Sequence, residues 1–281
     1  MKKMILLGAL AVSFATTSTQ GQSVEELLGL NVSAIQTPAD PTMTGHAQAE
    51  EAPLYFRATV NPLLVGAISL QDAGSSGGST TISGAKVEFD VGIGFGLSFG
   101  WRIPDSYVFI QLDTGFQWAG VNDFNGTLTV GGGGGGAAAS FDLRTSGGNL
   151  YQVPVLITPG LEFDLGGQWP FLNGAAIRFG PSVGFMYYNL KINDIEATST
   201  SNDDIFDING NGLVFTYGAM VNLDLFLSHN VALTLGWQLQ ATSPIDYGQF
   251  NVDQGNSGQL SDAKTNFTYT NVMSCGISIY F

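Results

Sequence analysis

From Leu54 to Phe281, hydrophobic and polar residues alternate along the chain with a period of two. This period is typical of β-strands, in which successive side chains lie on opposite faces. Turn-forming residues divide the alternating region into separate stretches. The pattern predicts an all-β protein with eight strands, at about 54–69, 86–101, 106–121, 149–165, 175–190, 212–227, 231–245 and 266–281.

The connections between these predicted strands alternate in length. The long ones are 70–85, 122–148, 191–211 and 246–265, and the short ones are 102–105, 166–174 and 228–230. Transmembrane β-barrels of outer membranes combine short periplasmic turns with longer extracellular loops. The layout therefore predicts an eight-stranded antiparallel up-and-down transmembrane β-barrel over residues 54–281, with ten strands as the alternative. An even strand count places both barrel termini on the periplasmic side.

Composition agrees with a membrane protein that does not use helices. Charged residues make up only 11% of the chain, less than half the share of about 25% found in soluble domains. Beyond the N-terminus, no run approaches the ~20 apolar residues that a membrane-spanning helix needs. A closed barrel is the other structure that satisfies every backbone polar group in lipid.

Side-chain size indicates which face of each strand points outward. An eight-stranded barrel has an interior just wide enough to be filled by side chains, so large apolar residues on the inward face would overfill it. In the stretch 212–227 the predicted lipid face comprises Leu213, Phe215, Tyr217, Ala219, Val221, Leu223, Leu225 and Leu227. In the stretch 86–101 the same reasoning places Val87 outside and Lys86, Glu88, Asp90, Gly92, Gly94, Gly96 and Gly100 inside, where the glycines make room.

Charged residues on the inward register form a candidate site. Buried charges must be paired, because each unpaired one costs several kcal/mol of desolvation. We therefore expect a salt-bridge network that helps to fill the lumen, and a charged conduit for ions is the alternative. The candidate residues are Arg57, Asp113, Glu162, Asp164, Arg178 and Asp224.

The C-terminal stretch alternates fully and ends on an aromatic residue. Its apolar positions include Met273, Cys275, Ile277, Ile279 and Phe281. This pattern resembles the β-signal that the barrel assembly machinery recognises in outer-membrane proteins. Together with the strand layout, the chain resembles the outer-membrane β-barrel superfamily of OmpA-type transmembrane domains, OmpX and the opacity proteins. The resemblance implies the fold and a place in the outer membrane, and the peptidoglycan-binding domain of OmpA-type proteins is missing after the barrel.

The N-terminal residues predict export. Lys2 and Lys3 precede an apolar run over residues 4–15, which is the layout of a signal peptide over residues 1–21. Residues 22–53 then predict a periplasmic extension or linker, in which the capping-box spacing from Ser23 to Glu26 allows a short helix. The single cysteine, Cys275, excludes an intrachain disulfide.

One motif raises a metal hypothesis. Asp207, Asn209 and Asn211 match the first half of an EF-hand calcium loop, but Gly218 stands where the bidentate Glu is needed. A weak calcium site and an ordinary turn rich in Asn and Gly are both compatible with these residues, and no other cofactor is expected. The run of glycines at 131–136 predicts the tip of a hairpin with arms 125–130 and 137–144.

The sequence offers little that indicates an enzyme. Its two histidines, His46 and His229, lie in a predicted linker and a predicted periplasmic turn, so the usual general base is missing. The net charge of −14 argues against a nucleic-acid partner. We expect a non-enzymatic outer-membrane protein whose extracellular loops contact an unidentified partner, as in adhesion, or support envelope integrity. A narrow pore for ions or small solutes is the alternative function.

Overall fold

The computed structural model describes residues 52–75, 80–132, 136–166, 172–197, 204–245, 250–251, 259–261, 264–265 and 267–281. The predicted signal peptide and nearly all of the predicted linker, including Ser23, Glu26 and His46, lie outside these ranges. Within them, no helix is long and apolar enough to cross a membrane. The described chain forms one antiparallel sheet.

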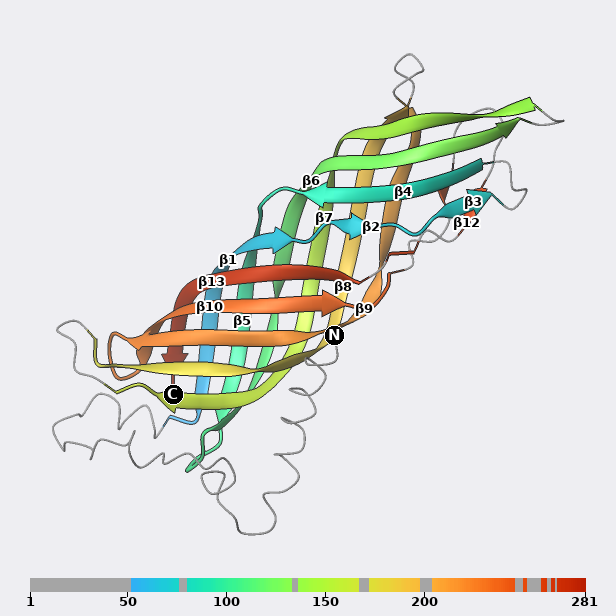
Figure 1. The fold of residues 1–281 in the computed structure, drawn as a ribbon. Coiled ribbons are helices and arrows are strands. Elements are labelled where there is room, and N and C mark those ends of the chain that lie inside the picture. The colour runs from blue at the N-terminus through green and yellow to red at the C-terminus, as the bar shows by residue number, and fades with distance from the viewer. Residues whose placement is uncertain are drawn as a thin grey trace, which may run out of the picture.

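The longer strands of this sheet close into a ring (Figure 1). Each pairs with the next in an antiparallel register, and the last pairs with the first, as in Tyr55↔Tyr280. The prediction of an all-β antiparallel sheet that closes into a barrel is therefore confirmed. The strands, in ring order, are β1 (Leu54–Val65), β5 (Gly92–Arg102), β6 (Val108–Gly132), β7 (Gly136–Asp164), β8 (Gly174–Ala197), β9 (Asp204–Phe226), β10 (Val231–Thr242) and β13 (Thr268–Tyr280).

Shorter strands extend the sheet at one end, which we call the upper end. They are β2 (Ile68–Ser69), β3 (Ala73–Ser75), β4 (Thr80–Phe89), β11 (Phe250–Asn251) and β12 (Gln259–Ser261). β4 pairs with the part of β6 that lies beyond β5, and β3, β12 and β11 follow in that order. Figure 1 shows β3, β4 and β12 at the opposite end of the molecule from the C-terminus.

The ring is much taller on one side than on the other. β6, β7, β8 and β9 have 25, 29, 24 and 23 residues, whereas β1, β10 and β13 have 12, 12 and 13. The part that all ring strands share, up to about Gly120 of β6 and Met186 of β8, is called the ring section here. The remainder, comprising β2 to β4 and the upper parts of β6 to β9, is the upper extension.

The predicted loops 122–148 and 191–211 are largely hairpins of this upper extension. Leu128 pairs with Phe141, which confirms the predicted hairpin with arms 125–130 and 137–144. Residues 133–135, between the two arms, lie outside the described ranges. Lys191 pairs with Asn209, so the second segment continues β8 and β9 and is not the long loop that was predicted. Polar outward residues made it resemble a loop, although Ile192, Ile195 and Ile208 are buried on its inner face.

Register shifts in β4 reverse the predicted orientation of several side chains. The pairing with β6 shifts between Ser83 and Lys86 and again between Glu88 and Phe89, and a one-residue shift moves side chains to the other face of a strand. Val87 is fully buried, whereas Lys86, Glu88 and Asp90 project outward. The prediction that these three lie inside and Val87 outside is therefore wrong.

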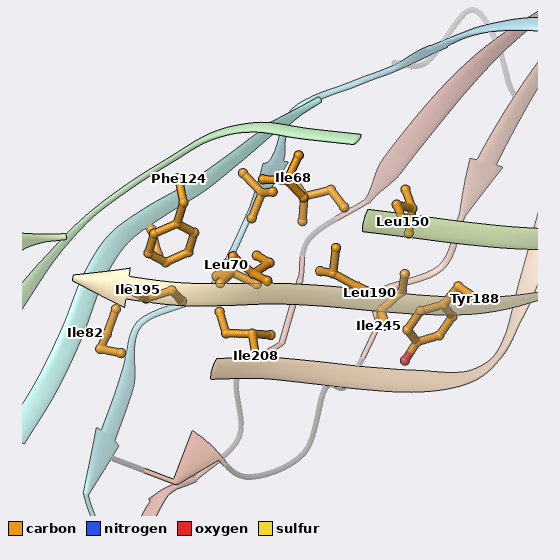
Figure 2. Close-up of a cluster of buried hydrophobic side chains, with 14 of the residues drawn as sticks. Ile68, Leu70, Ile82, Phe124, Leu150, Tyr188, Leu190, Ile195, Ile208 and Ile245 are labelled. Atoms are coloured by element: carbon orange, nitrogen blue, oxygen red, sulfur yellow. The ribbon is translucent and has the colours of Figure 1, made fainter. Parts of the chain in front are cut away.

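In the ring section the outward face is apolar, as predicted. Phe215, Leu235 and Trp237 have 47%, 41% and 40% of their surface exposed, whereas Arg178, Thr216 and Asp224 are completely buried inside. In the upper extension the buried side chains are apolar instead (Figure 2). This upper cluster comprises Ile68, Leu70, Ile82, Ala85, Val87, Val121, Phe124, Leu128, Leu143, Leu150, Met186, Tyr188, Leu190, Ile192, Ile195, Ile208, Val214 and Ile245.

Candidate functional site

The candidate site is a group of charged side chains inside the ring section, with Arg178 of β8 at its centre. Cross-strand register places Glu162 directly opposite Arg178, and it places Asp224 opposite Ala176, two residues before Arg178. The Arg178 Nε donates to Glu162 Oε2, and its Nη1 lies 2.9 Å from Asp224 Oδ2. One guanidinium thus joins carboxylates from the two neighbouring strands.

Asp224 connects this pair to the opposite wall of the barrel. Arg57 of β1 places Nη2 3.5 Å from Asp224 Oδ1, and its Nε donates to Ser278 at 3.0 Å. Thr234 also donates to Asp224, and it shares a 2.7 Å hydrogen bond with Ser278. Asp224 therefore binds groups from β1, β8 and β10, so the network fixes the strands to one another across the lumen.

Two tyrosines enclose the Arg178 guanidinium. Its central carbon lies 4.2 Å from the centre of the Tyr55 ring and 5.4 Å from that of Tyr280, within the range of cation–π attraction. Tyr280 also accepts a hydrogen bond from Arg178 and donates to Asp224 at 2.8 Å. The Tyr55 ring fits because Gly100 lies opposite it, where a Cβ would come within 1.9 Å of the ring.

A third arginine completes the charge balance. Arg102, the last residue of β5, places Nη2 2.8 Å from Glu162 Oε1. We call Tyr55, Arg57, Arg102, Glu162, Arg178, Asp224 and Tyr280 the lumen network. The predicted set lacked Arg102, Tyr55 and Tyr280, although odd and even positions along the strands would have indicated them. Arg102 continues the inward even-numbered register of β5, and Tyr55 shares the register of Arg57.

Asp113 lies beside this network with neutral partners. It accepts hydrogen bonds from Ser98 at 2.6 Å, Gln111 at 2.5 Å and Thr158 at 3.3 Å. Gln111 in turn accepts from Tyr55 at 2.6 Å, which links Asp113 to the lumen network. With Asp113 included, three carboxylates face three guanidinium groups, so these charges balance.

Asp164, the remaining predicted member, lies elsewhere. It is the last residue of β7, its side chain is exposed, and it accepts a hydrogen bond from the Gly166 amide at 2.8 Å. Although its register parity is inward, the strand ends there, so the side chain is outside the enclosed lumen. Asp164 therefore has to be removed from the predicted set.

Clusters of apolar side chains lie toward both ends of the lumen. A lower cluster of Ala52, Tyr55, Ala176, Phe226, Ala232 and Tyr280 lies at the end where the chain terminates, with the Phe226 and Tyr280 ring centres 5.2 Å apart. At the other end lies the upper cluster. The arrangement positions and neutralises charges in a closed space.

The calcium motif is not a loop in the structure. Asp207, Asn209 and Asn211 lie at alternate positions of β9, and Asn209 and Asn211 pair with Lys191 and Asn189 of β8. Alternate residues of a strand are about 6.6 Å apart, so these three do not converge as the ligands of an EF-hand loop do. Nowhere in the described ranges do three or more His, Cys, Asp or Glu side chains gather to hold a metal ion.

The predicted β-signal residues share the outer face of the barrel. Met273, Cys275, Ile277, Ile279 and Phe281 are all exposed. Hydrogen bonds between the backbones of Phe281 and Leu54 fasten the end of the chain to the start of β1. His229 lies in the exposed turn between β9 and β10, outside the lumen.

No family model matches the chain, and no curated protein matches it. Its structure is similar to that of neisserial surface protein A, with 13% sequence identity over 81% of this chain and 97% of that chain and a TM-score of 0.34. It is also similar to outer membrane protein OprG from Pseudomonas aeruginosa, with 12% identity over 82% of this chain and 96% of that chain and a TM-score of 0.38. A third similar structure is outer membrane protease OmpT from Escherichia coli, with 11% identity over 82% of this chain and 97% of that chain and a TM-score of 0.43. At such identities nothing follows about activity, and the fold rests on this chain's own strand pairing.

Proposed function

We propose that the chain is an integral, non-enzymatic outer-membrane protein whose upper extension contacts partners outside the cell. The membrane-spanning part is the eight-stranded ring of β1, β5 to β10 and β13, within a barrel domain of residues 54–281. Residues 1–21 direct export and residues 22–53 stay in the periplasm. Both barrel termini then face the periplasm, and the upper extension faces outward.

The band of apolar side chains around the outside of the ring section carries this proposal. Contiguous exposed apolar patches beyond a few hundred Å² are rare on soluble proteins and mark membrane or protein contacts. Here every ring strand contributes, as Phe56, Phe95, Leu112, Ile157, Val183, Tyr217, Leu235 and Ile277 show. A band that encircles a barrel whose interior is charged matches lipid on all sides.

The filled lumen favours an interaction protein over an open pore. The lumen network and the two apolar clusters lie in series along the barrel axis, and each consists of buried side chains. The polar hairpins β6–β7 and β8–β9 project beyond the apolar band, and loops and tips of that kind commonly carry binding functions. We expect the purified protein to show no stepwise conductance in planar lipid bilayers.

The orientation is tested by labelling cells. A short epitope inserted between Gly132 and Gly136, at the tip of the β6–β7 hairpin, should be detected by antibody on intact cells. The same epitope inserted after Ser228, in the turn between β9 and β10, should be detected only after the outer membrane is permeabilised. The reverse result would overturn the proposed orientation, and failure of the protein to fractionate with outer membranes would overturn the location.

Recognition by the barrel assembly machinery through Phe281 is part of the proposal. Its support is the uninterrupted outward row that ends at Phe281, because an apolar strand can be added to an open sheet edge by backbone pairing. Phe281→Asp should reduce the amount of folded, heat-modifiable protein on gels and leave the chain to periplasmic proteases. The matched variant Phe267→Asp, at the start of the same row, should be tolerated better. Equal folded yields for wild type and Phe281→Asp would contradict the β-signal.

A further inference from the structure

The middle of the lumen, between the lumen network and the upper cluster, contains a polar cavity. About 50 Å³ of it is open to the centres of water molecules, and one water needs about 10–15 Å³ of such space. The cavity follows from a row of small residues in register around the wall, in which Thr59 pairs with Gly96 and Gly276, and Gly96 with Gly115. We call this cavity the chamber.

Polar atoms that line the chamber lack hydrogen bonds within the described residues. They are Asn61 Oδ1, Gln117 Oε1 and Arg57 Nη2, on side chains that are 7%, 3% and 2% exposed as whole residues. The Arg57 atom has only a long ion pair, at 3.5 Å, with Asp224. Two free acceptors beside a cationic donor suit water, which both donates and accepts, better than a cation that Arg57 would repel.

Along β1, β6 and β7 the polar lining of the chamber ends abruptly at its upper side. Along the wall, Asn61, Gln117 and Gln152 form one polar level, in which Gly94 separates Asn61 from Gln117. Two residues further up each strand, the inward side chains are Leu63, Ala119 and Leu150. On β1, β6 and β7 the polar lining therefore gives way to apolar side chains within a single repeat of the strands, whereas Gln240 and Thr242 of β10 and Thr268 and Thr270 of β13 continue it upward.

The centre of the upper cluster is filled by connections from the short side of the ring. Ile68 and Leu70 follow β1, and Ile245 follows β10; Figure 2 shows them among the wall residues Leu150, Tyr188 and Leu190. Short backbone pairings hold these connections: Ile68 and Ser69 form the two-residue strand β2 against β4, and single bonds join Leu70 N to Ala85 O at 2.8 Å and Thr265 N to Ile245 O at 2.8 Å. We call residues 66–72 with Ile245 and Thr265 the lid.

We propose that the chamber is a hydrated section of a latent pore and that the lid is the removable closure between it and the extracellular side. The inference rests on the proposed orientation in the outer membrane and adds a second activity, passage of water and of solutes of similar size. Segments held by short pairings, as β2 is with its two residues, open locally at lower free energy than long, fully paired strands. Opening the lid exposes the unbonded side-chain oxygens of Asn61 and Gln117 to the outside.

Thiol labelling in detergent tests the chamber without a membrane. In a Cys275→Ser background, Gln117→Cys places a single thiol in the chamber. A water-soluble methanethiosulfonate reagent should modify it slowly when the lid is intact and at least tenfold faster when Leu70→Asp is added. The matched control, Leu128→Asp on the β6 wall of the same cluster, should leave the slow rate unchanged. Ile68→Ala with Leu70→Ala replaces Leu70→Asp if the charge prevents folding, as judged by gel mobility.

Equal labelling rates with intact and altered lids would overturn the lid, and an unreactive thiol in every folded variant would overturn the chamber. In planar bilayers, the Leu70→Asp protein should show stepwise conductance that the wild type lacks. A labelling increase without conductance would retain the chamber and exclude the pore. If the protein fails to enter lipid at all, the proposed membrane function fails, whereas the labelling result in detergent still decides the chamber and its lid.

Discussion

The ring section and the upper extension are built from the same strands with opposite polarity. Along the inner face of β8, Arg178 and Ser182 of the ring section are followed by Tyr188, Leu190 and Ile192 of the upper extension. On the outer face the change runs the other way, from exposed Phe185 and Tyr187 to exposed Lys191 and Asn193. One strand therefore carries the polarity pattern of a membrane barrel in its lower part and that of a soluble barrel in its upper part.

With the ring section in lipid, as proposed, the exchange follows from the medium outside each part of the barrel. In lipid, apolar side chains face outward and the polar ones must satisfy one another inside. In water, apolar side chains gain free energy by burial, at roughly 25 cal/mol per Å² removed from solvent. The level of the exchange, near Trp118 in β6 and Tyr187 in β8, therefore marks the proposed outer boundary of the membrane.

The largest expected effect comes from breaking the charged interior of the ring section. Arg178→Ala leaves Glu162 and Asp224 without their shared cation in a buried site, and loss of one partner of such a pair costs about 3–5 kcal/mol. Unfolding by urea in lipid vesicles, followed by tryptophan fluorescence, measures it. Arg102→Ala, at the rim with 17% of its side chain exposed, should cost less.

The double variant sharpens this result. Because Arg178 and Asp224 are in contact, Arg178→Ala with Asp224→Asn should recover part of the loss. Strictly additive losses would show that the ion pair does not couple the two residues, and the charged interior would then have to be treated as independently solvated groups.

A charge on the outside of the ring section should cost somewhat less. Leu235→Arg places a cation on the apolar band, where arginine near the middle of a bilayer costs about 2–4 kcal/mol in barrels of this kind. The neighbouring Thr234→Ser keeps the hydroxyl that binds Asp224 and should cost little. If a folding titration in lipid gave equal values for the two variants, the assignment of the faces would be wrong.

The interior of the upper extension should behave like the core of a soluble protein. Ile192 is completely buried in the upper cluster, so Ile192→Val removes one methylene from a packed site and should cost about 0.5–1.5 kcal/mol. Urea unfolding followed by hydrogen exchange of the β8 and β9 amides locates the loss. An unchanged stability would mean that the cluster is loosely packed.

The smallest effect is expected on the outside of the upper extension. Asn211→Arg adds a charge to an exposed position of β9 above the apolar band, and exposed substitutions in water usually change stability by less than about 0.5 kcal/mol. A loss in lipid as large as that of Leu235→Arg would show that the membrane reaches this level, which would move the proposed boundary upward.

Uninterrupted alternation made the ring section predictable from sequence. The outward row from Leu213 to Leu225 has no register shift in its pairing with β8, so the alternation alone assigned its faces. Both carboxylates that contact Arg178 were predicted because they lie on the inward register of neighbouring strands. Val87 and Lys86 were assigned to the wrong faces because bulges shift the register of β4, and the alternation of the sequence does not show where a bulge occurs.

The rest of the site depends on contacts across the barrel. Tyr280 meets Arg178 only because the ring closes, since the two residues are 102 positions apart in the chain. The β6–β7 hairpin of the upper extension was predicted from its glycine run, whereas the continuation of β8 and β9 was missed for a different reason. Polar outward residues and glycines in this continuation are typical of loops. The pairing of Lys191 with Asn209 depends on the two strands lying side by side, which the sequence pattern does not indicate.

The unequal strand heights have a consequence for the order of assembly. The tall hairpins β6–β7 and β8–β9 join residues that are close in sequence, so their pairing needs little loop closure. The seam between β1 and β13 joins residues as distant as Arg57 and Ser278, 221 positions apart, but along only 12 and 13 residues. Strands β6 to β9 can therefore pair while the barrel is still an open sheet. The last step, closure of the barrel between β1 and β13, then has the shortest edges to align.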